Sequence, residues 1–386
     1  MKTIRMLLLV ATICCDTHRA VAQTWTQTSL PTTSWSSVAS SADGTKLIAI
    51  ISQHGVPFGF YTSTNSGVTW TKSFTGEAGC VASSADGSYL VALDDSLPTI
   101  LTSTNYGSSW HQNLSFHING WVSVASSANG SNLVAITSAF PGTTIYTSKD
   151  AGTTWATNSL TAFGGYSVAS STDGNKLVVA LGDDRIYTST NSGTTWRTNI
   201  TLTGSWITVA SSADGSKLVA AAFGGKIYTS TNSGTTWKTN SVPVANWNAI
   251  ASSADGTKLV AAIQSGQIYT STNSGAIWKT NNAPNKSWTS VASSADGNLL
   301  VAADYSSGGV WIAQNTPTPK LNLSASPGQV MLSWLVPSTN FVMQQSSDLA
   351  SWSSVTDAPV LNLTNLQNQV ILLPTNSSGF YRLATP

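Results

Sequence analysis

The octapeptide STNSGTTW stands at residues 189–196 and again, unchanged, at residues 230–237. It belongs to a longer phrase, Tyr/Leu-Thr-Ser-x-Asn/Asp-x-Gly-x-x-Trp, which ends at Trp70, Trp110, Trp155, Trp196, Trp237 and Trp278. A second phrase, close to SVASSADG, occurs seven times and ends at Gly44, Gly87, Gly130, Gly174, Gly215, Gly256 and Gly297. Its copies lie 41 to 44 residues apart. Self-similarity at this period predicts a solenoid or a propeller.

One repeat unit, residues 206–238, contains four strand-like segments separated by turn signals. WITVASS alternates and is rich in β-branched residues, and the Asp-Gly pair after it predicts a hairpin turn. KLVAAA, KIYTST and TTWKT follow, separated by GGK and NSG. No long segment shows the 3.6-residue period of a helix. Four short antiparallel strands per unit describe one propeller blade, so we predict an all-β, seven-bladed β-propeller over residues 23–314.

The two ends of the repeat region complement each other. The seventh unit lacks its Asn/Asp-x-Gly-x-x-Trp strand, whereas TWTQTSL, residues 24–30, supplies a similar segment at the start. Trp25 precedes Trp70 by 45 residues, which is close to the other Trp intervals. We therefore expect the N-terminal strand to complete the last blade and to close the ring without an unpaired sheet edge.

The second phrase resembles the Asp-box, or BNR, repeat of sialidase-like propellers, Ser-x-Asp-x-Gly-x-Thr-Trp. The segment from Ser148 to Trp155 matches it well, and Asn replaces the Asp in five other copies, Asn65, Asn105, Asn191, Asn232 and Asn273. The phrase is also similar to repeats in photosystem II assembly factors and in xyloglucan-cleaving enzymes. The resemblance implies a propeller whose Asp-boxes are structural turns opposite the functional face. Asn can form the same turn, because its side chain also bonds the local backbone.

The remaining segments predict export and a second domain. Residues 1–22 have the pattern of a signal peptide cleaved after Ala22, which would make the protein secreted or periplasmic. Residues 315–319, NTPTP, form a stiff linker. Residues 320–386 show strand patterns that predict a small β-sandwich, similar to fibronectin III or immunoglobulin-like modules, with Trp334 and Trp352 in its core.

Composition excludes several classes of partner. Without residues 1–22 the chain keeps 14 basic and 15 acidic residues, and this neutral balance argues against nucleic acid or anionic lipid as the main partner. No apolar segment is long enough to span a membrane. Cys80 is the only cysteine beyond residue 22, so no disulfide or cysteine metal cage forms within the chain. We expect a monomer without metal or cofactor.

Blade topology divides the loops between two faces. With the strands of each blade lettered A to D, the A–B and C–D turns share what we call the turn face. The B–C and D–A loops share the variable face, whose sequences differ between copies, as suits binding. The Asp of each Asp-Gly turn, for example Asp43, is interpreted as a turn residue.

Three groups on the variable face are candidates for ligand binding. A Trp stands three residues before the central Val or Ile of strand A in five blades, where its ring could stack on a sugar or pack between blades. Acidic B–C loops could bind a cation or sugar hydroxyls, or could simply be solvated. Glu77, the only glutamate, could pair with a loop aspartate in a glycosidase. The ligand-binding candidates from the first two groups are Trp35, Trp121, Trp206, Trp247, Trp288, Asp94, Asp183 and Asp184.

No catalytic constellation is convincing. Sialidases grip a carboxylate with three arginines, but beyond residue 22 this chain has only Arg185, Arg197 and Arg382, of which Arg185 alone is placed on the variable face. The histidines, expected on the variable face, lack zinc-site spacing. We therefore predict non-catalytic recognition of a glycan or a protein surface. A glycoside hydrolase or lyase and an assembly factor remain the alternatives.

Overall fold

The computed structural model describes most of the chain from Thr24 onward. The described residues are 24–51, 59–76, 78–94, 99–113, 120–138, 142–160, 164–182, 185–199, 204–306, 308–314, 322–326, 329–335, 342–347, 351–356, 359–362, 367–372 and 380–384. Every regular element among them is a β-strand. The all-β prediction is confirmed.

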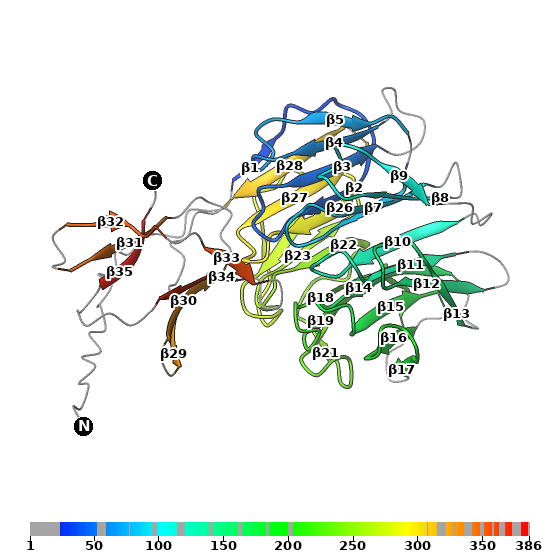
Figure 1. Ribbon diagram of the computed structural model, residues 1–386. Helices are drawn as coiled ribbons and strands as arrows, with labels where there is room; N and C mark the ends of the chain where they lie inside the picture. The colour runs from blue at the N-terminus through cyan, green and yellow to red at the C-terminus, as the bar shows by residue number, and fades with distance from the viewer. Residues whose placement is uncertain are drawn as a thin grey trace.

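Seven four-stranded antiparallel sheets fan around a common centre and form the predicted blades (Figure 1). Blades 1 to 3 comprise β2 (Trp35–Ser40), β3 (Leu47–Ile51), β4 (Phe60–Ser63) and β5 (Thr71–Phe74); β6 (Cys80–Ser83), β7 (Leu90–Asp94), β8 (Thr99–Ser103) and β9 (His111–Asn113); β10 (Trp121–Ser126), β11 (Leu133–Thr137), β12 (Thr143–Ser148) and β13 (Ala156–Leu160). Blades 4 to 6 comprise β14 (Gly165–Ser170), β15 (Leu177–Leu181), β16 (Arg185–Ser189) and β17 (Arg197–Asn199); β18 (Trp206–Ser211), β19 (Leu218–Ala222), β20 (Ile227–Ser230) and β21 (Lys238–Thr239); β22 (Trp247–Ser252), β23 (Leu259–Ile263), β24 (Ile268–Ser271) and β25 (Lys279–Thr280).

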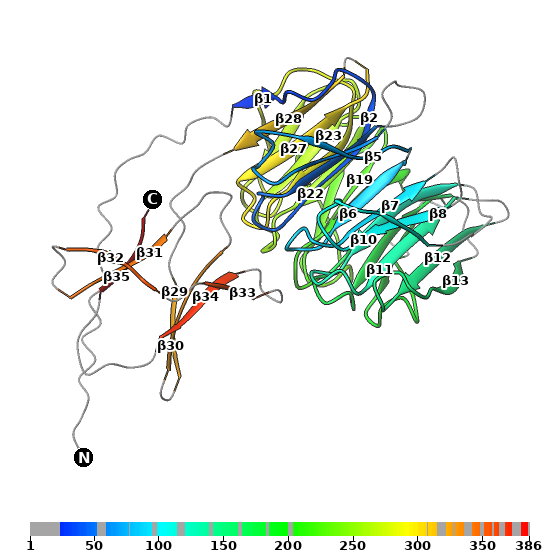
Figure 2. The same cartoon turned by 45° about the horizontal axis from the view of Figure 1, so that its top comes forward.

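The seventh blade joins the two ends of the propeller. Its strands are β26 (Trp288–Ser293), β27 (Leu299–Asp304), β28 (Gly309–Gln314) and, from the N-terminal end, β1 (Trp25–Gln27). β1 pairs antiparallel with β28, Trp25 opposite Ala313 and Gln27 opposite Trp311, and Figure 2 shows the two strands side by side. Trp25 is buried beside Trp288. The predicted N-terminal closure is confirmed, and β28 has a partner along its outer edge.

A ring of backbone hydrogen bonds links the inner strands at the centre. The residue before the Asp or Asn of each Asp-Gly turn donates its N–H to the carbonyl of the same residue in the next blade, at 2.7–2.8 Å. The last bond, from Ala295 to Ala42, closes the circle. We call this set the alanine ring; its members are Ala42, Ala85, Ala128, Thr172, Ala213, Ala254 and Ala295. Small side chains suit this position because seven of them converge there, and the alanines pack together.

Glycine is required in the Asn-x-Gly turns by conformation and by packing. In blade 5 the Ser230 hydroxyl accepts the N–H of Gly234 at 3.0 Å, and the Asn232 side chain accepts that of Thr236 at 2.9 Å. Gly234 has φ +80°, and a Cβ there would lie 2.9 Å from the Thr188 methyl of blade 4. The turn therefore docks directly against the neighbouring blade, with no space for a side chain.

The C-terminal residues form two further sheets with a shared core. One contains β29 (Asn322–Ser326), β30 (Gln329–Leu335), β34 (Gln367–Leu372) and β33 (Val360–Asn362); the other contains β32 (Ser353–Ser354), β31 (Val342–Ser346) and β35 (Phe380–Ala384). Trp334 and Val370 from the first sheet pack with Met343 from the second, as in a small sandwich. Trp352 is half-buried and lies under the Arg382 guanidinium, 4.2 Å from its ring centroid.

Candidate functional site

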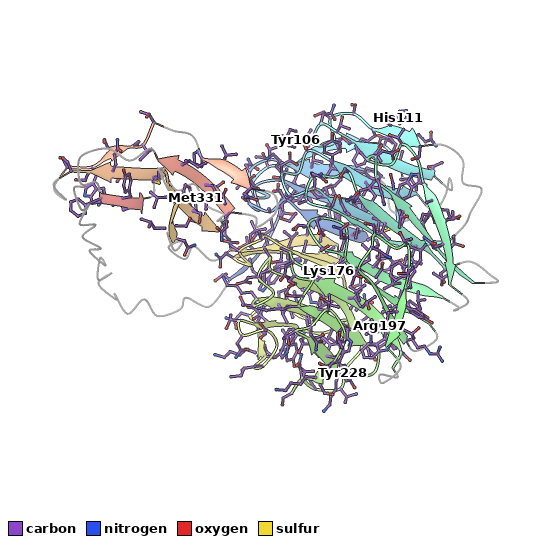
Figure 3. All side chains as sticks on the ribbon, turned by 60° about the horizontal axis from the view of Figure 1, so that its bottom comes forward. Tyr106, His111, Lys176, Arg197, Tyr228 and Met331 are labelled. Carbon is purple, nitrogen blue, oxygen red and sulfur yellow. The ribbon has the colours of Figure 1, made fainter. Side chains whose placement is uncertain are left out.

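The hydrogen bonds confirm the predicted division into two faces. On the turn face, the C–D turn of a blade bonds the A–B turn of the same blade, as in Ser233 N–H to Ser216 carbonyl at 2.8 Å. On the variable face, B–C turns pair with D–A segments through the bridges Gly225 to Ala245 and Gly266 to Lys286. Tyr106 and Lys176, labelled in Figure 3, belong to the turn face.

The turn-face carboxylates are occupied as hydrogen-bond acceptors. Asp214 accepts the Ser212 hydroxyl at 2.6 Å and the backbone N–H and hydroxyl of Ser216 at 2.9 Å and 2.7 Å. Burial raises the pKa of Asp214, but these hydrogen bonds and the charge of Lys176 outweigh burial and lower the pKa to about 2. A carboxyl group that stays ionised and bonded in this way stabilises its turn and is poorly suited to general acid catalysis.

Long polar side chains connect neighbouring blades across the turn face. The ammonium groups of Lys176, Lys217 and Lys258 each donate to the backbone carbonyl of the turn Asp in the following blade, at 2.9, 2.7 and 2.8 Å. The Asn132 amide makes the same contact with Asp173 at 2.7 Å. These contacts tie turns together, so we assign this face a structural role.

The five strand-A tryptophans are buried, which favours packing between blades over stacking on a sugar, the two roles that the sequence left open. Trp35, Trp206, Trp247 and Trp288 are 0% exposed, and Trp121 is 3% exposed. A bulge immediately after each Trp shifts the register with strand B. The rings pack inside and between the blades, where no sugar can reach them in this structure.

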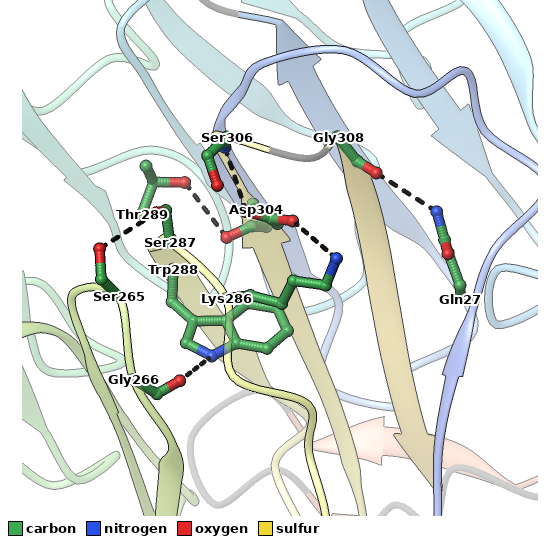
Figure 4. Close-up of polar contacts among 11 residues, drawn as sticks. Gln27, Ser265, Gly266, Lys286, Ser287, Trp288, Thr289, Asp304, Ser306 and Gly308 are labelled. Atoms are coloured by element: carbon green, nitrogen blue, oxygen red, sulfur yellow. Dashed lines mark hydrogen bonds and ion pairs between the residues drawn. The ribbon is translucent and has the colours of Figure 1, made fainter.

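The indoles are anchored by aromatic and hydrogen-bonding contacts. Trp247 packs edge-on against Tyr269 with ring centroids 5.3 Å apart, and similar contacts join Trp35 to Tyr61 and Trp206 to Tyr228. Figure 4 shows the Trp288 indole N–H donating to the Gly266 carbonyl of blade 6, at 3.0 Å. Each such Trp therefore acts as a wedge that holds adjoining blades together.

The acidic candidates are only partly described. The backbone of Asp94 ends β7 opposite Thr99, but its side chain lies outside the described set. Asp183, Asp184 and Glu77 also lie outside it, so their predicted roles remain predictions. Among the acidic residues of the B–C loops, Asp304 alone has a described side chain. Its carboxylate is fully buried and lies 3.7 Å from the Lys286 ammonium (Figure 4).

The histidine prediction needs one correction. His111 is exposed, but it pairs with Thr102 beside the C–D turn, and so it lies toward the turn face rather than on the variable face. His54 and His117 are outside the described residues. Within the described ranges, no group of three His, Cys, Asp or Glu side chains could hold a metal ion.

Sequence reasoning missed an exposed set of side chains on the variable face. Phe223, Gln264 and Tyr305 each follow the last residue of strand B, in blades 5, 6 and 7, and all three are exposed. We call them the B–C arc. Aligning the repeats on the end of strand B would have placed them in one column, two of whose members are aromatic.

The backbone holds the B–C arc rigidly. The N–H groups of Phe223, Gln264 and Tyr305 donate to the carbonyls of Ser205, Asn246 and Ser287, at 2.8, 2.8 and 2.9 Å. Each acceptor directly precedes a buried strand-A Trp, so the core fixes the position of the exposed side chain.

Two further apolar side chains lie on the variable face. Val244 is 65% exposed and adjoins the bridge between Gly225 and Ala245, close in the fold to Phe223. Tyr166, 45% exposed, stands at the start of strand A in blade 4. The face around blades 4 to 7 is therefore rich in exposed aromatic and apolar groups.

The fold is shared with propellers of known structure. YCF48 bound to D1 peptide matches with a TM-score of 0.58 and 18% identity, over 76% of this chain and 97% of that one. YCF48 from Cyanidioschyzon merolae gives 0.59 and 16%, over 76% and 99%. The WD40 repeats of RRP9 give 0.61 and 13%, over 76% and 99%. The likeness is one of fold.

No family model and no curated protein sequence matches the chain. The described part contains no helix of the length and apolarity that crossing a membrane requires.

Proposed function

We propose that this protein is a non-catalytic recognition module that binds an extended, largely uncharged polypeptide segment through the variable face of blades 4 to 7. The B–C arc is the observation that carries the proposal. Exposed aromatic side chains on a rigid backbone supply much of the binding energy in protein interfaces. The Gln264 amide, between two aromatic positions, can bond the main chain of an extended ligand.

The charges near the arc favour an uncharged segment. Among the described residues of blades 4 to 7, the charged groups of the variable face are Arg185, Lys226, Lys286 and Asp304, and Lys286 lies against the buried Asp304. A strongly acidic or basic ligand would therefore find little complementary charge there. A propeller of the same fold, YCF48, has been solved with the D1 peptide, which supports peptide recognition as a use of this architecture.

A glycan is the second candidate, because the exposed rings of Phe223 and Tyr305 could stack on sugars. In either case we propose that residues 1–22 export the protein, so that its partner is extracytoplasmic. An assembly role is compatible with peptide recognition. Hydrolysis would require Glu77 to act with a loop aspartate, and these side chains lie outside the described residues.

Binding to peptide and glycan arrays tests the proposal. We expect the full-length protein to select peptides, and the double variant Phe223→Ser/Tyr305→Ser to bind them at least about tenfold more weakly, because two interface aromatics are removed. The matched control is Val68→Ser/Ile277→Ser, which removes two exposed apolar side chains from the turn face, 73% and 60% exposed. Selection of glycans alone would favour the second candidate. Equal losses in both double variants would contradict the assignment of the face.

A further inference from the structure

One lysine on the turn face meets a carboxamide of the next blade. The Lys258 ammonium donates to the side-chain oxygen of Asn298 at 2.5 Å, in addition to the Asp296 carbonyl at 2.8 Å. Lys258 lies between the A–B turn and strand B of blade 6, and Asn298 occupies the preceding turn position in blade 7. The contact therefore bridges two blades.

A buried carboxylate completes the cluster. Asp296 accepts the Asn298 side-chain amide at 2.5 Å and its backbone N–H at 3.0 Å, while the Ser294 hydroxyl donates to it at 2.6 Å. Asp296 and Asn298 are 7% and 6% exposed. A carboxamide and a carboxylate with little access to water are thus held together beside a half-buried amine.

We propose that Lys258 and Asn298 form an intramolecular isopeptide bond that covalently joins blades 6 and 7. The half-buried Lys258 ammonium gives one proton to solvent, and the free amine attacks Cγ of Asn298. A bond forms between Nζ and Cγ, and the bond from Cγ to Nδ2 breaks. Asp296, hydrogen-bonded to Nδ2, transfers the second proton from Nζ to Nδ2 as that bond from Cγ breaks, and the departing ammonia takes up one proton from solvent, so that one ammonium ion leaves. The step needs no oxidant, metal or other reactant.

The surroundings favour the reactive form of each group. Burial lowers the pKa of Lys258, against the opposing charges of Asp296 and Asp255, which makes the neutral amine more accessible than on an exposed lysine. The fold holds the two groups side by side, and this proximity greatly raises the rate of a reaction compared with a bimolecular encounter. A carboxyl group bonded to the leaving nitrogen is placed to act as acid and base in turn. Attack requires Nζ to move from the carbonyl oxygen to the face of the amide, a rotation at the end of a flexible side chain.

The other blades provide internal comparisons. Lys217 donates to the Asp255 carbonyl in the same way, but Thr257 stands where blade 7 has Asn298. Lys176 donates to the carbonyl of Asp214 in blade 5, where Ser216 occupies the position of Asn298. Lys46 belongs to blade 1, and in blade 2, which follows it, Ser88 occupies that position. Hydroxyl side chains offer no carbonyl carbon to attack. Among the seven copies, only blades 6 and 7 pair a lysine at this position with an asparagine two residues after the turn aspartate of the next blade.

Tryptic peptide mapping of the purified full-length protein tests the bond directly. An acylated Lys258 resists trypsin, so we expect segment 239–279 to remain uncut at Lys258 and to be joined to segment 287–320, with the loss of one ammonia. Recovery of 239–258, 259–279 and 287–320 as separate peptides of unaltered mass would overturn the proposal without any variant.

Two lysine variants and one aspartate variant examine the mechanism. Lys258→Arg should abolish the linked peptide, whereas Lys217→Arg, which alters the equivalent contact one blade earlier, should leave it intact. Asp296→Asn should greatly reduce linkage in protein that still elutes as a folded monomer. Complete linkage in Asp296→Asn would remove Asp296 from the mechanism, and linkage in Lys258→Arg would show that another amine had reacted.

Discussion

Gly67 illustrates how strongly single turn residues are constrained. Its φ of +80° is left-handed, and a Cβ would lie 2.0 Å from Cδ1 of Ile312 in blade 7. We expect Gly67→Ala to lower the free energy of unfolding by about 2–4 kcal/mol, from backbone strain plus overpacking. Urea unfolding followed by Trp fluorescence measures this.

Gly224→Ala is the matched control for Gly67→Ala. Gly224 also has a left-handed φ, +63°, but the nearest atom to its Cβ position is 3.9 Å away. Only the backbone cost of about 1–2 kcal/mol should appear there. Equal losses in the two variants would show that contact between the blades is not the constraint at Gly67.

Asp150 offers a test of pH dependence at one residue. Hydrogen bonds from the Thr154 hydroxyl and backbone, and then from Ser148, lower its pKa to about 2. A depressed pKa contributes stability above the unfolded value of about 3.9, and this contribution is lost as pH falls toward 2. Asn191, bonded to Thr195 at 2.9 Å, shows that Asn suits the same turn.

Comparing melting temperatures of the wild type and Asp150→Asn from pH 7 to pH 2 measures this effect. We expect the two to melt together at neutral pH, and the wild type to lose more stability than the variant between about pH 4 and pH 2. A difference that stays constant with pH would contradict the role assigned to the carboxylate.

At the scale of the strand, the buried strand-A tryptophans hold neighbouring blades together. Trp247 is 0% exposed, bonds the Gly225 carbonyl at 3.1 Å and packs on Tyr269. Trp247→Ala should therefore cost about 3–5 kcal/mol of unfolding free energy. Phe223→Ala, at an exposed position one blade earlier, should cost no more than about 0.5 kcal/mol. Chemical denaturation of both variants measures the two losses of unfolding free energy. A small loss in Trp247→Ala would contradict its role as a wedge.

The contrast between Trp247 and Phe223 also shows where sequence reasoning stops. Turn residues were predictable, because the chemistry of Asp-Gly and Asn-x-Gly is local. The side of a strand that Trp247 faces was not, because a bulge follows it and the two-residue alternation cannot be extended across a bulge. Phe223 and Tyr305 were overlooked because the B–C turns differ in sequence, and only their place in the strand ladder relates them.

At the scale of the whole molecule, the repeat predicted both the number of blades and their closure. Each unit buries its surface against the next, so a linear row would leave two faces uncovered. The missing strand at one end and the extra strand at the other therefore specified a ring. The sequence could not show how the centre is held, since the alanine ring consists of backbone bonds between seven equivalent positions, six of which are alanine.

Removing β1 tests how far the ring depends on its closure. Deleting residues 24–27 would expose the edge of β28 and leave a cavity beside Trp288, where Trp25 packs. We expect a lower melting temperature and concentration-dependent self-association, because an unpaired edge recruits another strand. Light scattering coupled to size-exclusion chromatography over a range of concentrations measures the association.

The control for the β1 deletion is Thr26→Ser/Gln27→Ser, which alters two exposed side chains of β1 but keeps its backbone pairs. This variant should melt and elute close to the wild type. A deletion that stayed monomeric with an unchanged melting temperature would mean that the alanine ring and the contacts between blades hold the propeller without β1. An unchanged melting temperature together with concentration-dependent association would instead mean that β1 protects the edge of β28 without stabilising the fold.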